Sequence, residues 1–374
     1  MGDRQATEPV EPFFMESAPG AETTFNGRNY LYFCGTGYFG LHGNAEMIQA
    51  GVQALLAAGT HPGTGKTYGN SRFQADVETR LAGFFGTEAS VQYVSGYMNG
   101  LFLAQALAPD YDAIFVDENA HYNLWDGIRS TGKPVFVYRH CDPADLGARL
   151  KAELKPGQRP LAITDGVFPA LGELAPVPGL IQALEPYAGL LALDDAHGVG
   201  VLGEHGRGTF EHFGVSGERL FYAGTLSKAF GGHGGFLPGS GALIARIKQS
   251  LGAYQGASST PTPLAAASAR GIELVRDHPE WRRTLRENTE RLRSGLRSQG
   301  FQLHDTPFPI VAWALDSAAA MERVQAALKE QGIILPIFKN YAGAPENGLL
   351  RASVFSTHVP GDIDRLLAAL KAVV

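Results

Sequence analysis

The stretch LLALDDAHGVGVLGEHGRGT, residues 190–209, decides the fold class of this chain. It begins with an apolar run without alternation, which is typical of a strand buried on both faces of a sheet. The run ends in Asp194, and His197 follows three residues later. In open α/β sheets, ligands bind beyond the carboxyl ends of the strands. The stretch therefore predicts a buried parallel strand whose end presents polar side chains to a crevice.

The same pattern extends on both sides of this stretch, from about residue 90 to 240. Short β-rich runs alternate with helical patterns, and this order is typical of an α/β domain with a mostly parallel sheet. Helices are predicted at 45–58, 142–154 and 177–188. The predicted strands are SVQYVSG (90–96), DAIFVD (112–117), PVFVYR (134–139), PLAITDGVF (160–168), GLLALDDA (189–196) and RLFYAGT (219–225).

The pattern changes after about residue 245 and predicts a smaller α+β domain. A long helical stretch at 264–298 precedes strand-like runs at 309–315, 333–338 and 349–355, with helices at 317–331 and 360–373. Residues 1–29 read as a polar loop, and YLYFCG (30–35) as a short strand. We therefore expect an N-terminal arm (1–42), a large domain (43–255) and a small C-terminal domain with a linking helix (256–374).

Composition excludes several partners. The 374 residues carry a formal net charge of -6 and no run of Lys or Arg, which argues against nucleic acid and anionic membranes. No apolar stretch is long enough for a membrane span, and the first residues lack a signal-peptide pattern. The two cysteines, Cys34 and Cys141, form no metal or disulfide framework. We expect free thiols and a cytoplasmic protein.

Lys228 is the candidate for covalent chemistry. It is the single Lys of AGTLSKAFGGHGG (223–235), a small and apolar segment that follows a predicted strand. A surface Lys in a flexible loop is one reading; the other is a desolvated amine that forms an imine. Asp194 favours the second reading, because pyridoxal phosphate needs an anion that keeps its pyridine nitrogen protonated. No third ligand accompanies Asp194 and His197 at a fitting distance, so we predict no metal site.

Two further segments complete the predicted crevice. In YVSGYMNGL (93–101) a strand ends in a Ser-Gly turn and a helix begins, and the backbone N–H groups of such a turn can hold a phosphate. His121, in VDENAHYNLWDGIRS (116–130), follows another strand end. A packed or solvated His is the alternative interpretation at that position.

At these residues the sequence resembles the α-oxoamine synthase family, from about residue 30 to the end. The matching motifs, in order and with the right spacing, are YFGL (38–41), SGYMNG (95–100), TDGVF (164–168), DDAHGVGVLGEHGRG (194–208) and GTLSKAFGGHGG (224–235). The resemblance implies a fold-type I pyridoxal-phosphate transferase with a seven-stranded sheet. It also implies a homodimer with a shared active site.

The resemblance assigns roles to individual residues. Lys228 would hold the cofactor as an imine and take the Cα proton, Asp194 would pair with the pyridinium, His197 would bond the phenolic oxygen, and His121 would stack on the ring. Groups of Gly96, Tyr97 and Thr225 would hold the phosphate, together with Ser258, Ser259 and Thr260 of the partner subunit. Arg351 and Thr36 would bind the substrate carboxylate. Lys66 and Arg72 lie where related enzymes approach the acyl donor.

The chain departs from the family pattern at four positions. Thr36 and Gln74 replace an Asn and a His, Pro169 replaces a Ser near the cofactor, and Asn99 falls one place early in its motif. The favoured function is condensation of a small amino acid with an acyl-CoA or other acyl thioester to an α-amino ketone, usually with decarboxylation. Alternatives are an aminotransferase, an aldolase or racemase that starts from the same Cα carbanion, and a cofactor-fold protein without catalysis.

Overall fold

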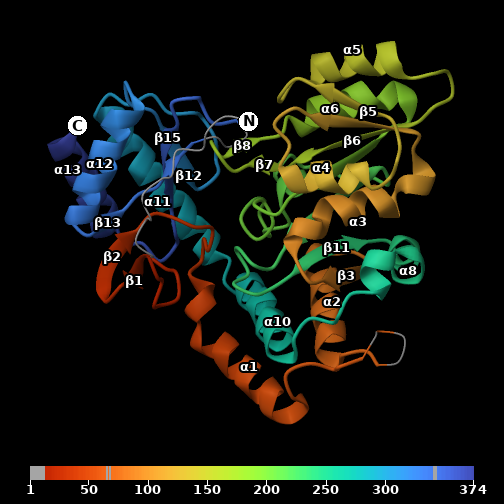
Figure 1. Cartoon of the computed structure of the whole chain (residues 1–374), viewed down its shortest axis with the longest axis horizontal. Coiled ribbons are helices and arrows are strands. Elements are labelled where there is room, and N and C mark those ends of the chain that lie inside the picture. Colours follow the sequence, from red (N-terminus) through yellow and green to blue (C-terminus); the bar gives the residue numbers. More distant parts are fainter. Residues whose placement is uncertain (1–12, 65, 67–68, 340–342) are drawn as a thin grey trace, which may run out of the picture.

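The computed structural model of the chain describes residues 13–64, 66, 69–339 and 343–374. A seven-stranded sheet forms its larger part (Figure 1). The strand order is β3-β11-β10-β9-β6-β4-β5. The strands are β3 Ala89–Tyr93, β4 Ala113–Asp117, β5 Val135–Tyr138, β6 Pro160–Asp165, β9 Leu190–Asp194, β10 Leu220–Thr225 and β11 Gly235–Gly239. The predicted mostly parallel α/β sheet is confirmed, because only β11 runs antiparallel to its two neighbours.

The sequence analysis missed strand β11. Its segment GFLPG contains Pro238, and a proline argues against a central strand because it lacks the N–H of the ladder. The structure accommodates Pro238 because β10 pairs only with Gly235 and Phe236. Pro238 therefore lies beyond the ladder on that side and faces Ser90 of β3 on the other.

Helices cover both faces of the sheet. Ile114 and Val116 of β4 pack into one hydrophobic cluster with α3 and α8, while Ala113 and Phe115 pack into another with α5 and α6. This double burial explains the apolar runs without alternation. The helices of this part are α2 Arg72–Phe85, α3 Asn99–Ala106, α4 Tyr122–Arg129, α5 Pro143–Glu153, α6 Val177–Leu184, α7 Thr209–His212, α8 Gly241–Ser250 and α9 Gly252–Gln255.

The C-terminal part holds a second, antiparallel sheet of order β12-β15-β14. It lies opposite the large sheet in Figure 1, next to α11, α12 and α13. Its strands are β12 Ile310–Trp313, β14 Ile337–Phe338 and β15 Leu349–Ser353, and its helices are α11 Glu280–Ser298, α12 Ala318–Glu330 and α13 Pro360–Val373. Within the described residues, every helix is either too short or too polar to traverse a bilayer.

Two predictions about local structure were wrong. The stretch 264–298 is not one helix: α10 (Thr262–Asp277) ends before His278-Pro279, and α11 begins after it. A residue before proline is disfavoured in the helical region, and His278 has φ -119° and ψ 64°. Residues 22–29 are not a plain loop either, since β1 (Glu22–Phe25) and β2 (Arg28–Tyr32) form a hairpin. The strand predicted at 30–35 corresponds to the second half of β2, which begins two residues earlier and ends at Tyr32. Strand β2 also pairs with β13 (Ile333–Ile334) of the C-terminal part.

The remaining elements connect the two parts. Helix α1 (Ala45–Ala58) lies against α10 at the lower edge of Figure 1. A short hairpin of β7 (Val167–Phe168) and β8 (Glu173–Leu174) follows β6. Because β4, β6, β9 and β10 are parallel, their carboxyl ends share one edge of the sheet.

Candidate active site

A cavity of about 220 Å³ lies at this shared edge. Other hollows are larger, such as one of about 480 Å³ beside α11, but this one gathers the residues predicted for catalysis. Its lining consists of Ser95, Gly96, Tyr97, His121, Asn123, Asp165, Pro169, Asp194, Ala196, His197, Thr225, Ser227 and Lys228. The structure thus brings together the predicted Lys228, Asp194, His197, His121, Gly96, Tyr97 and Thr225.

Asp194 ends strand β9 and is buried, with 5% of its surface exposed. The side-chain amides of Asn99 and Asn123 donate to its two carboxylate oxygens at 2.8 and 2.7 Å. The backbone N–H of Ala196 adds a third bond at 3.1 Å. These donors are neutral amides, so they fix the carboxylate without cancelling its charge. The arrangement can receive a cation or a protonated ring nitrogen from the cavity.

Asp165 ends the neighbouring strand β6, in register with Asp194. Burial and the nearby Asp194 carboxylate raise the pKa of Asp165 well above its ordinary value. Its carboxyl group accepts the backbone N–H of His121 at 2.8 Å, which holds the start of α4 against the strand ends. The His121 ring in turn lies 2.7 Å from Asn123 Oδ1. The wall made by His121, Asn123 and Asp165 is therefore one connected network.

His197 is buried on the other side of Asp194, with its Nδ1 2.8 Å from the Tyr38 hydroxyl. Burial, followed by the charge of Lys228, lowers the pKa of His197 well below its usual value, so the ring is neutral. Burial also raises the pKa of Tyr38, which keeps its proton. In the tautomer where Tyr38 donates to Nδ1, the Nε2 of His197 carries the ring hydrogen.

Lys228 follows strand β10 and is half-buried at the cavity. Desolvation lowers its pKa to about 8, although the carboxylates of Asp194 and Asp165 act in the opposite direction. Its amine makes no hydrogen bond to any of the residues that the structure describes. A desolvated amine of this kind is a nucleophile near neutral pH.

The opposite end of the cavity is built from backbone. A single 3₁₀ turn, Gly96–Met98, precedes α3, and the Ser95 hydroxyl accepts the N–H of Tyr97 at 3.2 Å. A Cβ added to Gly96 would lie 2.8 Å from the Cβ of Thr225, so only glycine lets this turn approach β10 so closely. The Thr225 hydroxyl donates to Gly234 O and accepts from Ser227 N. Hydroxyl and N–H groups at a helix start suit an anion.

Arg351 and Thr36 do not line the cavity. Arg351 is buried on β15, donating to Pro169 O at 2.7 Å and to Ser353 Oγ at 2.9 Å. Pro169 itself lines the cavity, so the guanidinium lies directly behind that wall. Thr36 is half-buried in the turn before Tyr38.

The predicted partner-facing segment also lies outside this cavity. Ser258 is exposed, whereas Ser259 and Thr260 are buried and their hydroxyls have no hydrogen-bond partner among the described residues. Lys66 donates to Tyr254 O at 3.0 Å and lies over that ring, and burial lowers its pKa to about 8. Gln74 is buried on α2 and bonds Gln92 O at 3.0 Å.

Sequence reasoning missed four residues of the site: Asn99, Asn123, Asp165 and Tyr38. Asn99 was noted only as a displaced motif residue, yet it holds Asp194. Asn123 and Tyr38 act on catalytic side chains from remote segments, which spacing along one chain does not reveal. Asp165 did carry a signal, because it ends a predicted strand as Asp194 does.

The donor set fits pyridoxal phosphate. An unpartnered, desolvated lysine amine and an amide-held carboxylate line the same cavity, with a glycine turn and a hydroxyl at one end. The amine matches the aldehyde of the cofactor, the carboxylate matches its ring nitrogen, and the glycine turn with the hydroxyl matches its phosphate.

The sequence pattern of the family "aminotransferase class I and II" matches residues 37–370. The 8-amino-7-oxononanoate synthase 1 of Polaromonas sp. is 36% identical over 365 residues, which cover 94% of this chain and 88% of that protein. The 8-amino-7-oxononanoate synthase 2 of Bacillus subtilis is 31% identical, covering 96% and 92%. A solved serine palmitoyltransferase of Sphingomonas wittichii superposes with a TM-score of 0.90 and 27% identity, covering 96% and 91%.

Proposed function

The chain belongs to the class I and II aminotransferase family and, within it, to the α-oxoamine synthases, and on that basis we propose its reaction. It condenses a small amino acid with an acyl-CoA, or another acyl thioester, to an α-amino ketone, usually with loss of carbon dioxide. Its cofactor is pyridoxal phosphate. The observation that carries the proposal is one cavity lined by a desolvated Lys228 and an Asp194 held by two amides.

Bound pyridoxal phosphate supplies an electron sink for the charge left at Cα when a bond there breaks. Lys228 would anchor the cofactor through its amine, and its Nζ would accept the proton from the substrate Cα. Asp194 keeps the ring nitrogen protonated. His197 would donate from Nε2 to the phenolic oxygen of the cofactor, with Tyr38 donating to Nδ1 to hold that tautomer.

The other cavity residues position the cofactor. His121 would cover one face of the ring, and its contacts with Asn123 and Asp165 fix the place of the imidazole. The N–H groups of Gly96 and Tyr97 and the Thr225 hydroxyl hold the phosphate.

The substrate carboxylate is assigned to Arg351, with Thr36 nearby. A guanidinium carries five N–H donors in a fork that matches a carboxylate. Arg351 already donates to Pro169 O, which lines the cavity, so its charge is buried next to the substrate space. Lys66 and Arg72 mark the approach of the acyl thioester.

The active enzyme is a cytoplasmic homodimer in this proposal, with Ser258, Ser259 and Thr260 reaching the partner's phosphate site. Helix α1 supports this with an exposed apolar stripe of Ile48, Val52, Leu55 and Leu56. Both cysteines are unpaired, as expected in a reducing compartment.

An assay of free coenzyme A tests the reaction. Glycine, alanine and serine are each incubated with the holoprotein and with either acetyl-CoA or a longer acyl-CoA. We expect one amino acid to release coenzyme A from one thioester, and Lys228→Ala to abolish the release. Transamination without thioester consumption would instead establish the aminotransferase alternative.

A further inference from the structure

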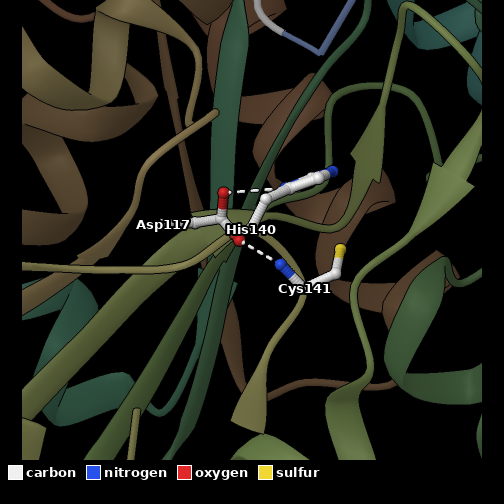
Figure 2. A group of neighbouring side chains, drawn as sticks. All are labelled: Asp117, His140 and Cys141. Atoms are coloured by element: carbon white, nitrogen blue, oxygen red, sulfur yellow. Dashed lines mark hydrogen bonds and ion pairs between the residues drawn. The ribbon is translucent and has the colours of Figure 1, made fainter. Parts of the chain in front are cut away.

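A second group of reactive side chains lies at the carboxyl ends of β4 and β5, outside the cavity. Figure 2 shows Asp117, His140 and Cys141, each of which offers a ligand atom within 4.8 Å of the others. Glu173 of β8 approaches from the hairpin, with Oε2 3.2 Å from His140 Nε2. His304 approaches from the loop before β12, with Nε2 3.9 Å from Glu173 Oε1.

Asp117 orients the group through three contacts of its carboxylate. Its Oδ1 accepts the N–H of Asn119 and lies 2.9 Å from His140 Nδ1, while its Oδ2 accepts the N–H of Cys141 at 2.9 Å. In Figure 2 the far ring nitrogen of His140 and the sulfur of Cys141 both point away from Asp117. A carboxylate on one ring nitrogen is the arrangement that orients metal-binding imidazoles.

Cys141 and Glu173 both lie beside the His140 ring, from which they offer a thiol and a carboxylate. The Cys141 sulfur and a ring nitrogen of His140 lie within 4.8 Å of each other, and the thiol is 4.0 Å from Leu174 O, beside Glu173. Cys141 also has φ 50°, a left-handed conformation that residues with a Cβ rarely adopt, so the loop holds this thiol against a backbone preference. Two ligands of a tetrahedral zinc ion, each about 2.0–2.3 Å from it, lie about 3.3–3.8 Å apart. The 3.2 Å between His140 Nε2 and Glu173 Oε2 is close to that spacing.

We propose that His140 Nε2, Cys141 Sγ and a Glu173 oxygen bind a divalent transition metal of the zinc class, with His304 as the fourth ligand. Nitrogen, thiolate and carboxylate together suit zinc. The ion replaces the thiol proton of Cys141 and any proton on His140 Nε2, so binding releases protons to solvent.

The position gives the ion a structural effect on the active site. Glu173 belongs to the β7–β8 hairpin, whose turn carries Pro169 of the cavity wall, and the His140 ring packs edge-on against Phe168 at 4.4 Å. His304 belongs to the C-terminal part. The ion therefore ties the ends of β4 and β5 to that wall and to the C-terminal loop.

A metal-free explanation exists for the same contacts: a protonated His140 ring can bridge the carboxylates of Asp117 and Glu173. The two explanations differ in the role of Cys141. An ion pair does not need its sulfur, whereas a metal site does.

The test uses chelator-treated holoprotein, dialysed against zinc(II) for elemental analysis and titrated with cobalt(II) in the visible range. The variants are Cys141→Ser and Glu173→Gln, and Cys34→Ser is the matched control because Cys34 is the other half-buried thiol. We expect one ion per chain and visible cobalt bands of a tetrahedral thiolate site. Cys141→Ser and Glu173→Gln should each weaken binding by at least about tenfold, since even outer partners of a ligand cost 10–100-fold.

Uptake well below one ion per chain, or binding that Cys141→Ser and Glu173→Gln leave unchanged, overturns the metal site and leaves the ion pair. A second readout is the thermal midpoint of the holoprotein, which zinc should raise in the Cys34→Ser control and not in Cys141→Ser. Neither measurement depends on the substrate of the enzyme.

Discussion

The Asp194 carboxylate is held in place by the side-chain amides of two asparagines from different helices. Asn99 starts α3 and Asn123 lies in α4, and each occupies one carboxylate oxygen. A buried carboxylate that loses a donor keeps its desolvation cost without compensation. In the proposed mechanism, protonation of the cofactor's ring nitrogen thus depends on Asn99 and Asn123, which contact Asp194 and not the ring nitrogen.

Asn123→Leu tests this dependence. Asp194 Oδ2 loses the 2.7 Å bond, and the loss of a hydrogen bond to a charged buried group costs about 1–3 kcal/mol. We expect weaker binding of pyridoxal phosphate and a kcat/KM about 10–100-fold lower, because about 1.4 kcal/mol is tenfold. The control is Asn347→Leu at an exposed position. Unchanged cofactor affinity and kcat in Asn123→Leu would remove Asn123 from the site.

Lys228 provides a pH prediction. Desolvation lowers its pKa to about 8 from the ordinary 10.5, so the folded protein offers the free amine above about pH 8. Covalent capture of pyridoxal phosphate by the apoprotein should accelerate as pH rises to about 8 and then level off. Stopped-flow absorbance measures the rate, with Lys228→Ala as the blank. A rate still rising steeply near pH 10.5 would mean that Lys228 is not desolvated.

Among single residues, the sequence predicted those that lie at or just after the ends of predicted strands. It missed residues that act by hydrogen-bonding the catalytic side chains. Asp194 ends a strand, Lys228 and His197 follow one, and the structure places all three at the cavity. Tyr38 and Asn123 reach these residues from 159 and 71 positions away along the chain, and no local pattern encodes such contacts. The catalytic roles themselves stay predictions.

Among the elements, α4 matters most for the site, because its first residues carry Asn123 and its N-cap is His121. Its position is set by close packing on α3. A Cβ added to Gly127 of α4 would lie 2.2 Å from the carbonyl carbon of Gly100, and one on Gly100 would lie 2.5 Å from Asn123 O. The backbones touch, so the glycine pair fixes the distance from α4 to Asp194.

Gly127→Ala should therefore lower the free energy of unfolding and also displace α4 from its position next to Asp194. Overpacking of this kind costs about 1–3 kcal/mol, and here the obstacle is backbone. The control is Gly147→Ala in α5, where an added Cβ meets nothing within 4 Å and alanine should stabilise the helix by about 0.5–1 kcal/mol. Urea unfolding of both apoproteins measures the difference. Equal midpoints for the two variants would contradict the close packing.

Helices and strands were predictable where the apolar pattern agreed with the structural preferences of the residues in the segment. Helix α13 was predicted at its observed bounds, and the six sheet strands followed from apolar runs. Strand β11 was missed because Pro238 is a poor strand residue that only its place in the ladder permits. The break at His278-Pro279 was overlooked because the apolar periodicity continues across it.

For the whole molecule, the exposed stripe on α1 is the feature that the single chain leaves unexplained. Leu56 is 82% exposed, and Ile48 and Val52 are each about half exposed on the same face. A contiguous apolar patch of this kind marks an interaction surface. The predicted division into 1–42, 43–255 and 256–374 stays a prediction, and the pairing of β2 with β13 joins the first segment to the last.

Val52→Glu combined with Leu56→Glu should convert a dimer into monomers and remove most activity, because the proposed site is shared. Sedimentation velocity measures the change. Gln53→Glu, an exposed position on the same helix, is the control and should stay dimeric. A wild-type chain that sediments as a monomer with full activity would contradict the shared site.

One measurement tests acyl transfer most directly: mass spectrometry of the products formed from a carboxyl-¹³C amino acid, the accepted acyl-CoA and the holoprotein. We expect an unlabelled α-amino ketone, labelled carbon dioxide and free coenzyme A in equal amounts, all absent with Lys228→Ala. A labelled 2-oxo acid, with the thioester intact, would contradict the assignment and make the protein an aminotransferase.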